Sequence, residues 1–274
     1  MTTSDLLAQL LFRVGTACRV RGLLLKELAY LRRRNCAPQR IGVIDILRRP
    51  ERVEIPLRVA RFIPPRSAVH LIDVGANDGQ WAYRFLESFP SSTAELWEPL
   101  PHLAETLRIR YPDSGRVEIV PAAASDNSGR AQIVAPEHHA MASLHAYSDF
   151  ITKSPLHGRS QTIDIATRRL DDKPRSPEDR IIVLKVDAQG HELEVLAGAP
   201  TTLNLVSLAI VEASVAEMFR GRAPTFASVC CIMSQHGLFP CMFPSAGTMF
   251  GNHPVEQDII FVRQSALRAL SESV

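Results

Sequence analysis

A glycine turn between an apolar run and a helical pattern is the first feature that could hold a ligand. Val69–Val74 is rich in β-branched residues and predicts a buried strand. Gly75 and Gly79 bracket a tight turn, and apolar residues at helical spacing follow from Trp81. A strand, a glycine turn and a helix N-terminus together form a cradle for a nucleotide-like cofactor.

The residue types in this turn favour one kind of cofactor. Dinucleotide folds use Gly-x-Gly-x-x-Gly, which lets the backbone approach a pyrophosphate. Here Asn77 occupies the middle glycine position, and Asp73 places a carboxylate before the turn. A carboxylate repels pyrophosphate and suits an ammonium group, so the turn favours S-adenosylmethionine. We expect Asp73 to hold the methionine ammonium and Asn77 to hydrogen-bond the cofactor. Gly75 and Gly79 would allow close backbone approach.

Two further strand ends complete the expected cofactor site. Glu98 ends the predicted strand 93–98, 19 positions after Gly79. A ribose-binding carboxylate belongs at about that distance, so we expect Glu98 to accept both ribose hydroxyls. The next strand, 116–120, leads into the small residues of 121–126, and Ala124 there leaves room for a flat ring such as adenine.

Four titratable residues are the candidates for catalysis. Asp187 ends the apolar run 180–187, at a strand end where ligands bind in open α/β sheets. It could act as a base, orient a histidine or bind a divalent ion, and a structural ion pair with Lys185 is the plain alternative. His191 at the following helix start, Glu212 at the next strand end and His145 in a polar loop could face the same crevice.

The chemistry expected of these residues is removal of a proton from an alcohol. Metal-free general-base catalysis is one hypothesis. The other is a divalent ion held by Asp187, His191 and Glu212, whose ligand types are compatible with Mg²⁺ or Mn²⁺, although histidine makes Mg²⁺ the less suitable of the two.

The order of elements predicts the fold class. Strands and helices alternate from Val69 onward, which is typical of an α/β, doubly wound, mostly parallel sheet. We predict seven strands, with 238–242 and 258–262 as an antiparallel hairpin at one edge. Residues 127–170 are less regular, with short strands at 132–135 and 162–166, and are interpreted as a substrate-facing lid.

The N-terminal region differs from the rest of the chain. Ser4 caps a predicted helix that reaches Leu31 and ends near Asn35 and Pro38. This helix either packs on the domain or a partner subunit, in a homodimer, or rests on an anionic membrane as a basic amphipathic helix. Five prolines in 38–68 predict a connector with one short helix, 41–48. The expected division is an extension over 1–66, a catalytic domain over 67–266 and a tail over 267–274.

Length, charge and cysteines exclude several classes. The 274 residues have room for one large domain and an extension. Residues 1–68 carry 14 Lys/Arg against five Asp/Glu, a charge of +9, so with +2 overall the remainder carries −7. An acidic body whose basic residues lack interleaved aromatics argues against nucleic acid. Five cysteines without CxxC spacing argue against a disulfide framework or zinc site. The sequence also shows no apparent signal peptide and no membrane-spanning segment. Together with the cysteine pattern, this favours a location in the cytoplasm, with peripheral contact at the inner membrane face as an option.

These landmarks resemble the FkbM family of class I S-adenosylmethionine-dependent methyltransferases. The matching segments are 73–79, 98–99, 123–126, 143–144 and 184–192, with Leu196, Gly198 and Ala199 behind them. The resemblance implies a Rossmann-like fold and an O-methyltransferase, acting on a sugar hydroxyl of a glycolipid or related secondary metabolite. The family more often has Glu-Gly where this chain has Ala188-Gln189-Gly190, and often has Ala where His191 stands.

Three alternatives stay open beside the leading hypothesis. The acceptor could be a polyketide or hydroxy-fatty-acyl hydroxyl. A nicotinamide oxidoreductase is disfavoured by the missing middle glycine and by the Asp73 carboxylate. A non-catalytic scaffold with this fold is disfavoured by the presence of Asp73, Glu98 and Asp187 together.

Overall fold

The computed structural model describes residues 3–265 except for thirteen short segments, which are 35–36, 39–40, 49, 65–66, 113–114, 137–141, 147, 149–159, 176–179, 216–218, 221–223, 245–247 and 251–252. The side chains of 3–17, 50–53, 248–250 and 253–254 are also outside the description. The predicted C-terminal tail, 267–274, and most of the loop predicted inside the lid therefore lie outside the described residues.

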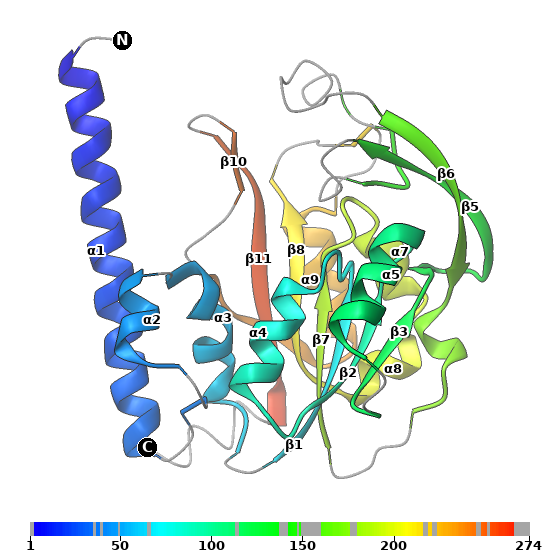
Figure 1. Ribbon diagram of the computed structural model, residues 1–274, viewed down its shortest axis with the longest axis horizontal. Helices are drawn as coiled ribbons and strands as arrows, with labels where there is room; N and C mark the ends of the chain where they lie inside the picture. Colours follow the sequence, from blue (N-terminus) through cyan, green and yellow to red (C-terminus); the bar gives the residue numbers. More distant parts are fainter. Residues whose placement is uncertain are drawn as a thin grey trace.

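A large, mostly parallel sheet organises the chain (Figure 1). Its strands follow the order β10-β11-β8-β7-β1-β2-β3, and β9 pairs with β11. The bounds are β1 Ala68–Val74, β2 Thr93–Trp97, β3 Val117–Val120, β7 Arg180–Val186, β8 Val206–Ser214, β9 Leu238–Met242, β10 Thr248–Phe250 and β11 His253–Arg263. From β3 to β8 all pairings are parallel, whereas β11 is antiparallel to β8, β9 and β10.

All seven predicted strands are present, and so is the antiparallel edge. The short β10 is an eighth strand that the sequence pattern did not predict, and β11 begins at His253 rather than at Asp258. The central strands are near-continuous apolar runs because helices bury both of their faces.

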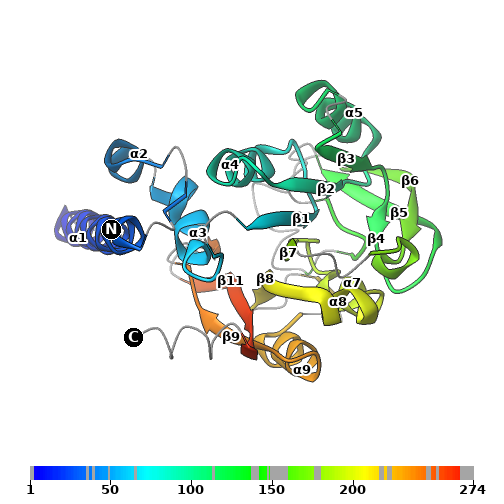
Figure 2. The ribbon, with the colours of Figure 1, turned by 90° about the horizontal axis from the view of Figure 1, so that it is seen from below.

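Helices cover the two faces of the sheet, as the view from below shows (Figure 2). The helices α4 (Gln80–Ser88) and α5 (Pro101–Arg110) lie on one face, and α7 (Glu192–Ala197), α8 (Pro200–Leu205) and α9 (Phe226–Gln235) lie on the other. Successive residues of β1 point to opposite faces of the sheet. Leu71 packs in the same cluster as Phe85 of α4, and Ile72 packs in the same cluster as Val195 of α7. The sheet therefore separates two hydrophobic cores.

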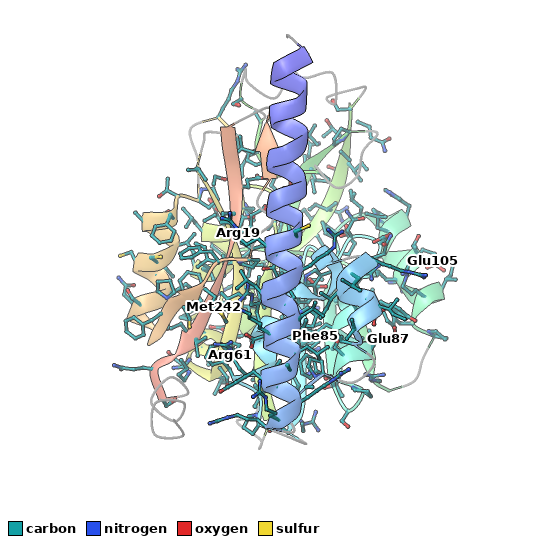
Figure 3. The ribbon with its side chains drawn as sticks, turned by 90° about the vertical axis from the view of Figure 1, so that its left-hand side faces the viewer. Arg19, Arg61, Phe85, Glu87, Glu105 and Met242 are labelled. Atoms are coloured by element: carbon teal, nitrogen blue, oxygen red, sulfur yellow. The ribbon has the colours of Figure 1, made fainter. Side chains whose placement is uncertain are left out.

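The N-terminal helix packs on the domain through its C-terminal half. Helix α1 spans Thr3–Arg33, close to the predicted bounds, and runs along one side of the molecule (Figures 1 and 3). Leu24 and Leu28 are buried in one cluster with Ile46 and Leu57. The Arg61 guanidinium donates two hydrogen bonds to the Glu27 carboxylate. No helix among the described residues is long and apolar enough to cross a bilayer.

The prediction of a connector with one short helix between α1 and the sheet is wrong in one respect. The short helix α2 (Val43–Arg48) is present, but a second helix, α3 (Pro50–Ala60), follows it directly. Proline is compatible with the first turn of a helix, so Pro50 does not prevent helix formation. Burial of Leu57 and Val59 against α1 and the sheet then stabilises α3 despite Pro56 in its interior.

The predicted lid, 127–170, contributes two of the three strands of a second, smaller sheet. Its strands are β4 (Ala123–Ala124), β5 (Gly129–Pro136) and β6 (Ser160–Arg168), in the order β4-β6-β5. Ile133 and Ile165 on one face of this sheet pack with Leu100 and Leu103 at the start of α5. A 3₁₀ turn, η3 (Leu170–Asp172), leads back toward β7. The two predicted short strands are confirmed, and both are longer than predicted.

Candidate functional site

A cavity lies at the carboxyl ends of the parallel strands, and we call it the strand-end cavity. Its lining includes six of the ten predicted site residues, which are Gly75, Asn77, Glu98, Ala124, Asp187 and His191. They come from four strand ends and the turns that follow them. This is the edge of an open α/β sheet where ligands are expected.

Close approach between neighbouring strand ends explains the first glycine of the turn. Gly75 has φ +77°, and a Cβ atom there would lie 1.9 Å from the backbone oxygen of Asp187. Asn77 is also left-handed, with φ +52°, and its N–H donates to Glu98 Oε2 at 2.8 Å. Gly79, in contrast, does not line the cavity. Its φ is +78°, and a Cβ there would lie 2.5 Å from Leu107 Cδ2, so both the backbone conformation and the packing of α4 on α5 favour a glycine.

Glu98 is a buried carboxylate that is anchored on both oxygens. Oε1 accepts from the Leu100 N–H at 2.9 Å and Oε2 from the Asn77 N–H. Burial raises the pKa of this carboxyl from its ordinary value to about 7. The side chain lines the strand-end cavity at the end of β2, which is the place that the predicted ribose contact requires.

Asp73 lies beneath the turn rather than in the cavity lining. The side chain is fully buried, and its Oδ1 lies 3.4 Å from Lys185 Nζ. Burial raises the pKa of Asp73, and the charge of Lys185 opposes that rise. Lys185 Nζ also lies 3.3 Å from Asp187 Oδ2, so the ion pair considered from the sequence is present and extends to Asp73. Contact between Asp73 and a methionine ammonium stays a prediction.

The predicted combination of Asp187, His191 and Glu212 is wrong as a metal-binding set. Gln189 Nε2 donates to Asp187 Oδ1 at 2.9 Å and to Glu212 Oε2 at 3.3 Å, so an amide bridges the two carboxylates. Gln189 and Gly190 both have positive φ and reverse the chain before His191. The imidazole therefore points away from the carboxylates, toward Ser125 and His145.

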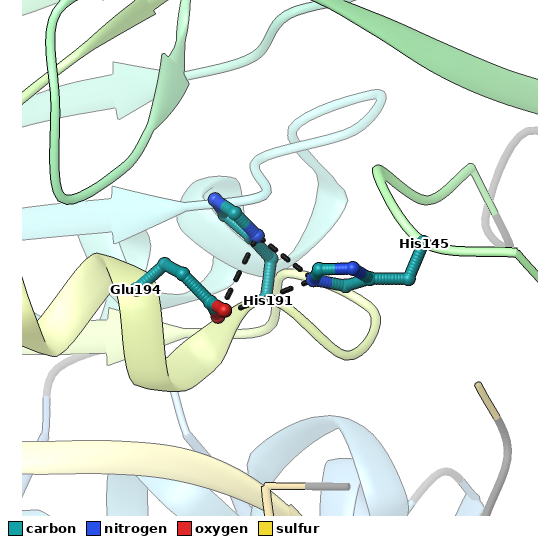
Figure 4. A group of neighbouring side chains, drawn as sticks. All are labelled: His145, His191 and Glu194. Atoms are coloured by element: carbon teal, nitrogen blue, oxygen red, sulfur yellow. Dashed lines mark hydrogen bonds and ion pairs between the residues drawn. The ribbon is translucent and has the colours of Figure 1, made fainter. Parts of the chain in front are cut away.

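The structure brings together a different set: His145, His191 and Glu194 (Figure 4). His145 Nε2 lies 3.0 Å from His191 Nδ1, and Glu194 Oε2 lies 3.6 Å from His191 Nδ1 and 4.0 Å from His145 Nε2. We call this set the histidine cluster. Glu194 was not predicted, although its spacing of three residues from His191 at a helix start was the available signal.

Ser143 positions His145 in the cluster. The backbone of Ser143 exchanges two hydrogen bonds with Val134 of β5. Its hydroxyl donates to the Gln189 carbonyl at 2.7 Å and accepts from the His145 N–H at 3.0 Å. The buried serine therefore joins the small sheet, the loop that carries His145 and the turn that precedes His191.

A second cavity adjoins the first, and we call it the polar cavity. Its lining includes Arg130 and Gln132 of β5 together with the three residues of the histidine cluster. His191 and Leu144 line both cavities. The His191 imidazole thus stands where a ligand in one cavity would meet a ligand in the other.

The sheet order, its antiparallel edge and the strand-end cavity define the fold of a class I S-adenosylmethionine-dependent methyltransferase. The chain belongs to the methyltransferase FkbM family, whose domain matches residues 73–238. The family resemblance predicted from the sequence is confirmed.

Individual proteins resemble the chain to different extents. It is 28% identical over 162 residues, 56% of this chain and 67% of the relative, to the 2-O-methyltransferase NoeI of Sinorhizobium fredii (strain NBRC 101917 / NGR234). Among solved structures, precorrin-6y C5,15-methyltransferase from Geobacter metallireducens GS-15 has a TM-score of 0.41 at 12% identity, covering 77% of this chain and 88% of that one. The O-methyltransferase NcsB1 from neocarzinostatin biosynthesis has a TM-score of 0.38 at 13% identity, covering 90% and 70%.

Proposed function

We propose that this chain is an S-adenosylmethionine-dependent O-methyltransferase that methylates a sugar hydroxyl, in a glycolipid or a related secondary metabolite. The observation that carries the proposal is the position of His191, whose imidazole lines both the strand-end cavity and the polar cavity. Membership of the FkbM family and the likeness to a 2-O-methyltransferase support it.

The strand-end cavity fits a cofactor without phosphate. Glu98 and Asp187 contribute carboxylates to its lining, and among the described residues no lysine or arginine lines it. Glu98 would hold the ribose hydroxyls, Ala124 would lie beside the adenine, and Gly75 and Asn77 would face the remainder of the molecule. S-adenosylmethionine would supply an electrophilic methyl group on its sulfonium centre.

The hydrogen bonds around His191 leave one ring nitrogen able to accept a proton. The Ser125 hydroxyl donates to Asp126 Oδ1 at 3.1 Å, so Ser125 Oγ, 3.0 Å from His191 Nε2, accepts the proton on that nitrogen. His191 Nδ1 then carries a lone pair, directed toward His145 and the polar cavity. An acceptor hydroxyl placed there would lose its proton to the histidine cluster, and a positioned base typically contributes about 10²- to 10⁴-fold in rate.

The lining of the polar cavity favours a hydroxyl-rich acceptor. Asp126, Asn127, Arg130 and Gln132 offer donors and acceptors in several directions. A sugar ring can satisfy such groups, whereas a hydroxy-fatty-acyl or polyketide chain would leave many of them unpaired. The polarity of this cavity is the reason for preferring a sugar over those two acceptors.

Calorimetric titration with S-adenosylhomocysteine, followed by turnover assays, tests the proposal. We expect micromolar binding by the wild type, a loss of at least about tenfold for Glu98→Ala, and no change for Glu105→Ala on the exposed face of α5. Methyl transfer is then measured with free sugars, glycolipids and hydroxy fatty acids. Absent cofactor binding would overturn the proposal, and binding without turnover on any acceptor would favour the scaffold alternative.

A further inference from the structure

We infer that the histidine cluster is a binding site for a divalent transition-metal ion of the Zn²⁺ or Mn²⁺ type. The three ligands would be His145 Nε2, His191 Nδ1 and Glu194 Oε2, which belong to two segments that pack at the edge of the polar cavity. This set differs from the combination predicted from the sequence, and it shares only His191 with it.

The spacing of the three ligand atoms suits a single ion. Zinc lies about 2.0 to 2.2 Å from imidazole nitrogen and carboxylate oxygen, which sets two ligand atoms of a tetrahedral site about 3.4 Å apart. The observed separations are 3.0 Å between the two imidazoles and 3.6 Å between His191 and Glu194. The third is 4.0 Å, so the three separations lie on both sides of the tetrahedral value and side-chain movements of about 0.6 Å or less bring each of them to it.

The hydrogen bonds of His191 select the ring form that a metal ion requires. A ligating histidine usually donates its other ring N–H to an acceptor, which fixes the tautomer and the orientation of the ring. Ser125 Oγ is that acceptor for His191 Nε2, because the serine proton is donated to Asp126. The Nδ1 lone pair is thereby directed at His145 Nε2, which donates its proton to it in the ligand-free protein, and a bound ion would displace that proton.

The cluster is held in place from both sides, so little order would be lost on binding. His191 is the N-cap of α7 and Glu194 lies in its first turn, which puts both on one rigid segment. Ser143 fixes the loop of His145 through the bond of its hydroxyl to the Gln189 carbonyl. The three side chains are only 10 to 16% exposed, and all three line the polar cavity.

The chemical types of the three ligands determine which metal ions suit the site. Two imidazoles and one carboxylate are typical of zinc sites that keep an open position, and also suit Mn²⁺ and Fe²⁺, whereas Mg²⁺ prefers oxygen ligands alone. An ion at this point would contact the acceptor hydroxyl and lower its pKa, which would deepen the proton removal described above. That role rests on the proposed function, but binding of the ion does not.

Metal titrations in the absence of donor and acceptor test the site. The full-length protein is treated with EDTA, dialysed and titrated with ZnCl₂ and MnCl₂ by calorimetry, and Co²⁺ is added to a separate sample to record the visible absorption of a site with nitrogen ligands. We expect one equivalent of Zn²⁺ in the wild type. His145→Ala and Glu194→Gln should each weaken binding by at least about tenfold.

Matched controls separate the cluster from other ligands on the chain. His236→Ala and Glu105→Gln remove the same groups at sites far from the cluster in sequence and should bind Zn²⁺ like the wild type. Glu194→Gln keeps the size of the side chain, and its thermal unfolding shows whether it is folded if His145→Ala is not. Absent Zn²⁺ binding, or binding that survives in both cluster variants and so resides on groups such as the exposed Cys18, Cys231 and Cys241, would overturn the inference.

The same samples distinguish this inference from the proposed function. S-adenosylhomocysteine is titrated into the wild type in the presence of EDTA, which removes the ion but leaves the strand-end cavity. Metal binding without cofactor binding would retain the metal site and overturn the methyltransferase. If cofactor binding and turnover resist EDTA and no Zn²⁺ binds, the methyltransferase proposal would be retained and the metal site overturned. The two histidines would then act as a base without a metal ion.

Discussion

His145 Nε2 lies 3.0 Å from His191 Nδ1, although the two residues are 46 positions apart in the chain. The contact joins the insertion that carries the small sheet to the turn between β7 and α7. Ser143 holds the backbone of His145 and Ser125 holds the imidazole of His191, so the pair is positioned from both sides. Since only His191 also reaches the strand-end cavity, the two histidines should have separable effects on cofactor binding and turnover.

Replacement of His145 by alanine should lower kcat by roughly 10²- to 10⁴-fold, because the cluster loses its part in proton removal. The affinity for S-adenosylhomocysteine should stay within about threefold, since His145 lines the polar cavity alone. Steady-state kinetics and calorimetry on the same preparation measure both quantities. The matched control is His236→Ala, on the turn after α9, which should keep the wild-type kcat. Equal losses of affinity and kcat in His145→Ala would contradict a separate acceptor site.

Cofactor binding should depend on pH through Glu98. Burial raises the pKa of this carboxyl to about 7 in the ligand-free protein, and two ribose hydroxyls that donate to it favour the ionised form. The dissociation constant of S-adenosylhomocysteine should therefore fall as the pH rises from 6 to 8, by at most about tenfold per pH unit. Glu98→Gln should bind more weakly and lose most of this dependence. A wild-type affinity that is constant over this range would show that Glu98 does not ionise on binding.

The same carboxyl should make the ligand-free protein less stable at higher pH. The folded state binds the Glu98 proton more tightly than the unfolded chain, because the pKa is raised from 4.5 to about 7. The stabilisation from this proton is fully present below pH 4.5 and is lost as the pH rises through 7. Urea unfolding of the wild type and Glu98→Gln at pH 5 and pH 8 measures it. The decrease in the free energy of unfolding between these values should be smaller in the variant.

Lys185 should be essential to the fold because it neutralises Asp73. Lys185→Met leaves a fully buried carboxylate without its cation, and removal of one partner of a buried pair costs about 3–5 kcal/mol of unfolding free energy. The double variant Asp73→Asn/Lys185→Met, which removes both charges, should recover a large part of that loss. Chemical unfolding of the single and double variants measures the difference. A double variant as unstable as Lys185→Met would mean that packing of the lysine stem, and not its charge, is what matters.

The sequence predicted the sheet well because its signals are local. Buried parallel strands are short apolar runs, and the residues at their ends, such as Glu98 and Asp187, reach the cavity wherever the sheet is formed in the usual order. The sequence did not predict helix α3 because the prolines of 38–68 indicate a connector. Burial of Ile55 and Val59 in the cluster beside the sheet, and of Leu57 in the cluster of α1, stabilises a helix there. Strand β10 is three residues long and carries too short a pattern to be detected.

The catalytic constellation could not be predicted from the sequence to the same degree. Asp187, His191 and Glu212 lie near strand ends that share one edge of the sheet, and Gln189 bridges the two carboxylates. His191 is directed elsewhere because Gln189 and Gly190 reverse the chain before it. The partners of His191 are Ser125, directly after β4, and His145, from the irregular insertion 127–170, where no periodic pattern fixes the register. The sequence therefore identified candidate catalytic residues but not which of their side chains are in contact.

A close approach behind the site should make Gly198 intolerant of even a methyl group. The Cβ of an alanine at this position would lie 1.9 Å from the Ser125 carbonyl oxygen, and both atoms belong to well-packed segments. The φ of Gly198 is −82°, so backbone strain is not the reason. Gly198→Ala should lower the free energy of unfolding by about 1–3 kcal/mol or more, as overpacking does, and should reduce kcat because Ser125 orients His191.

Gly22→Ala in α1 is the matched control: nothing lies within 4 Å of the added atom, and higher helix propensity should stabilise that variant by up to about 1 kcal/mol. Urea unfolding and turnover of both variants measure these effects, and a Gly198→Ala protein with wild-type stability and kcat would show that Ser125 can move without disturbing His191.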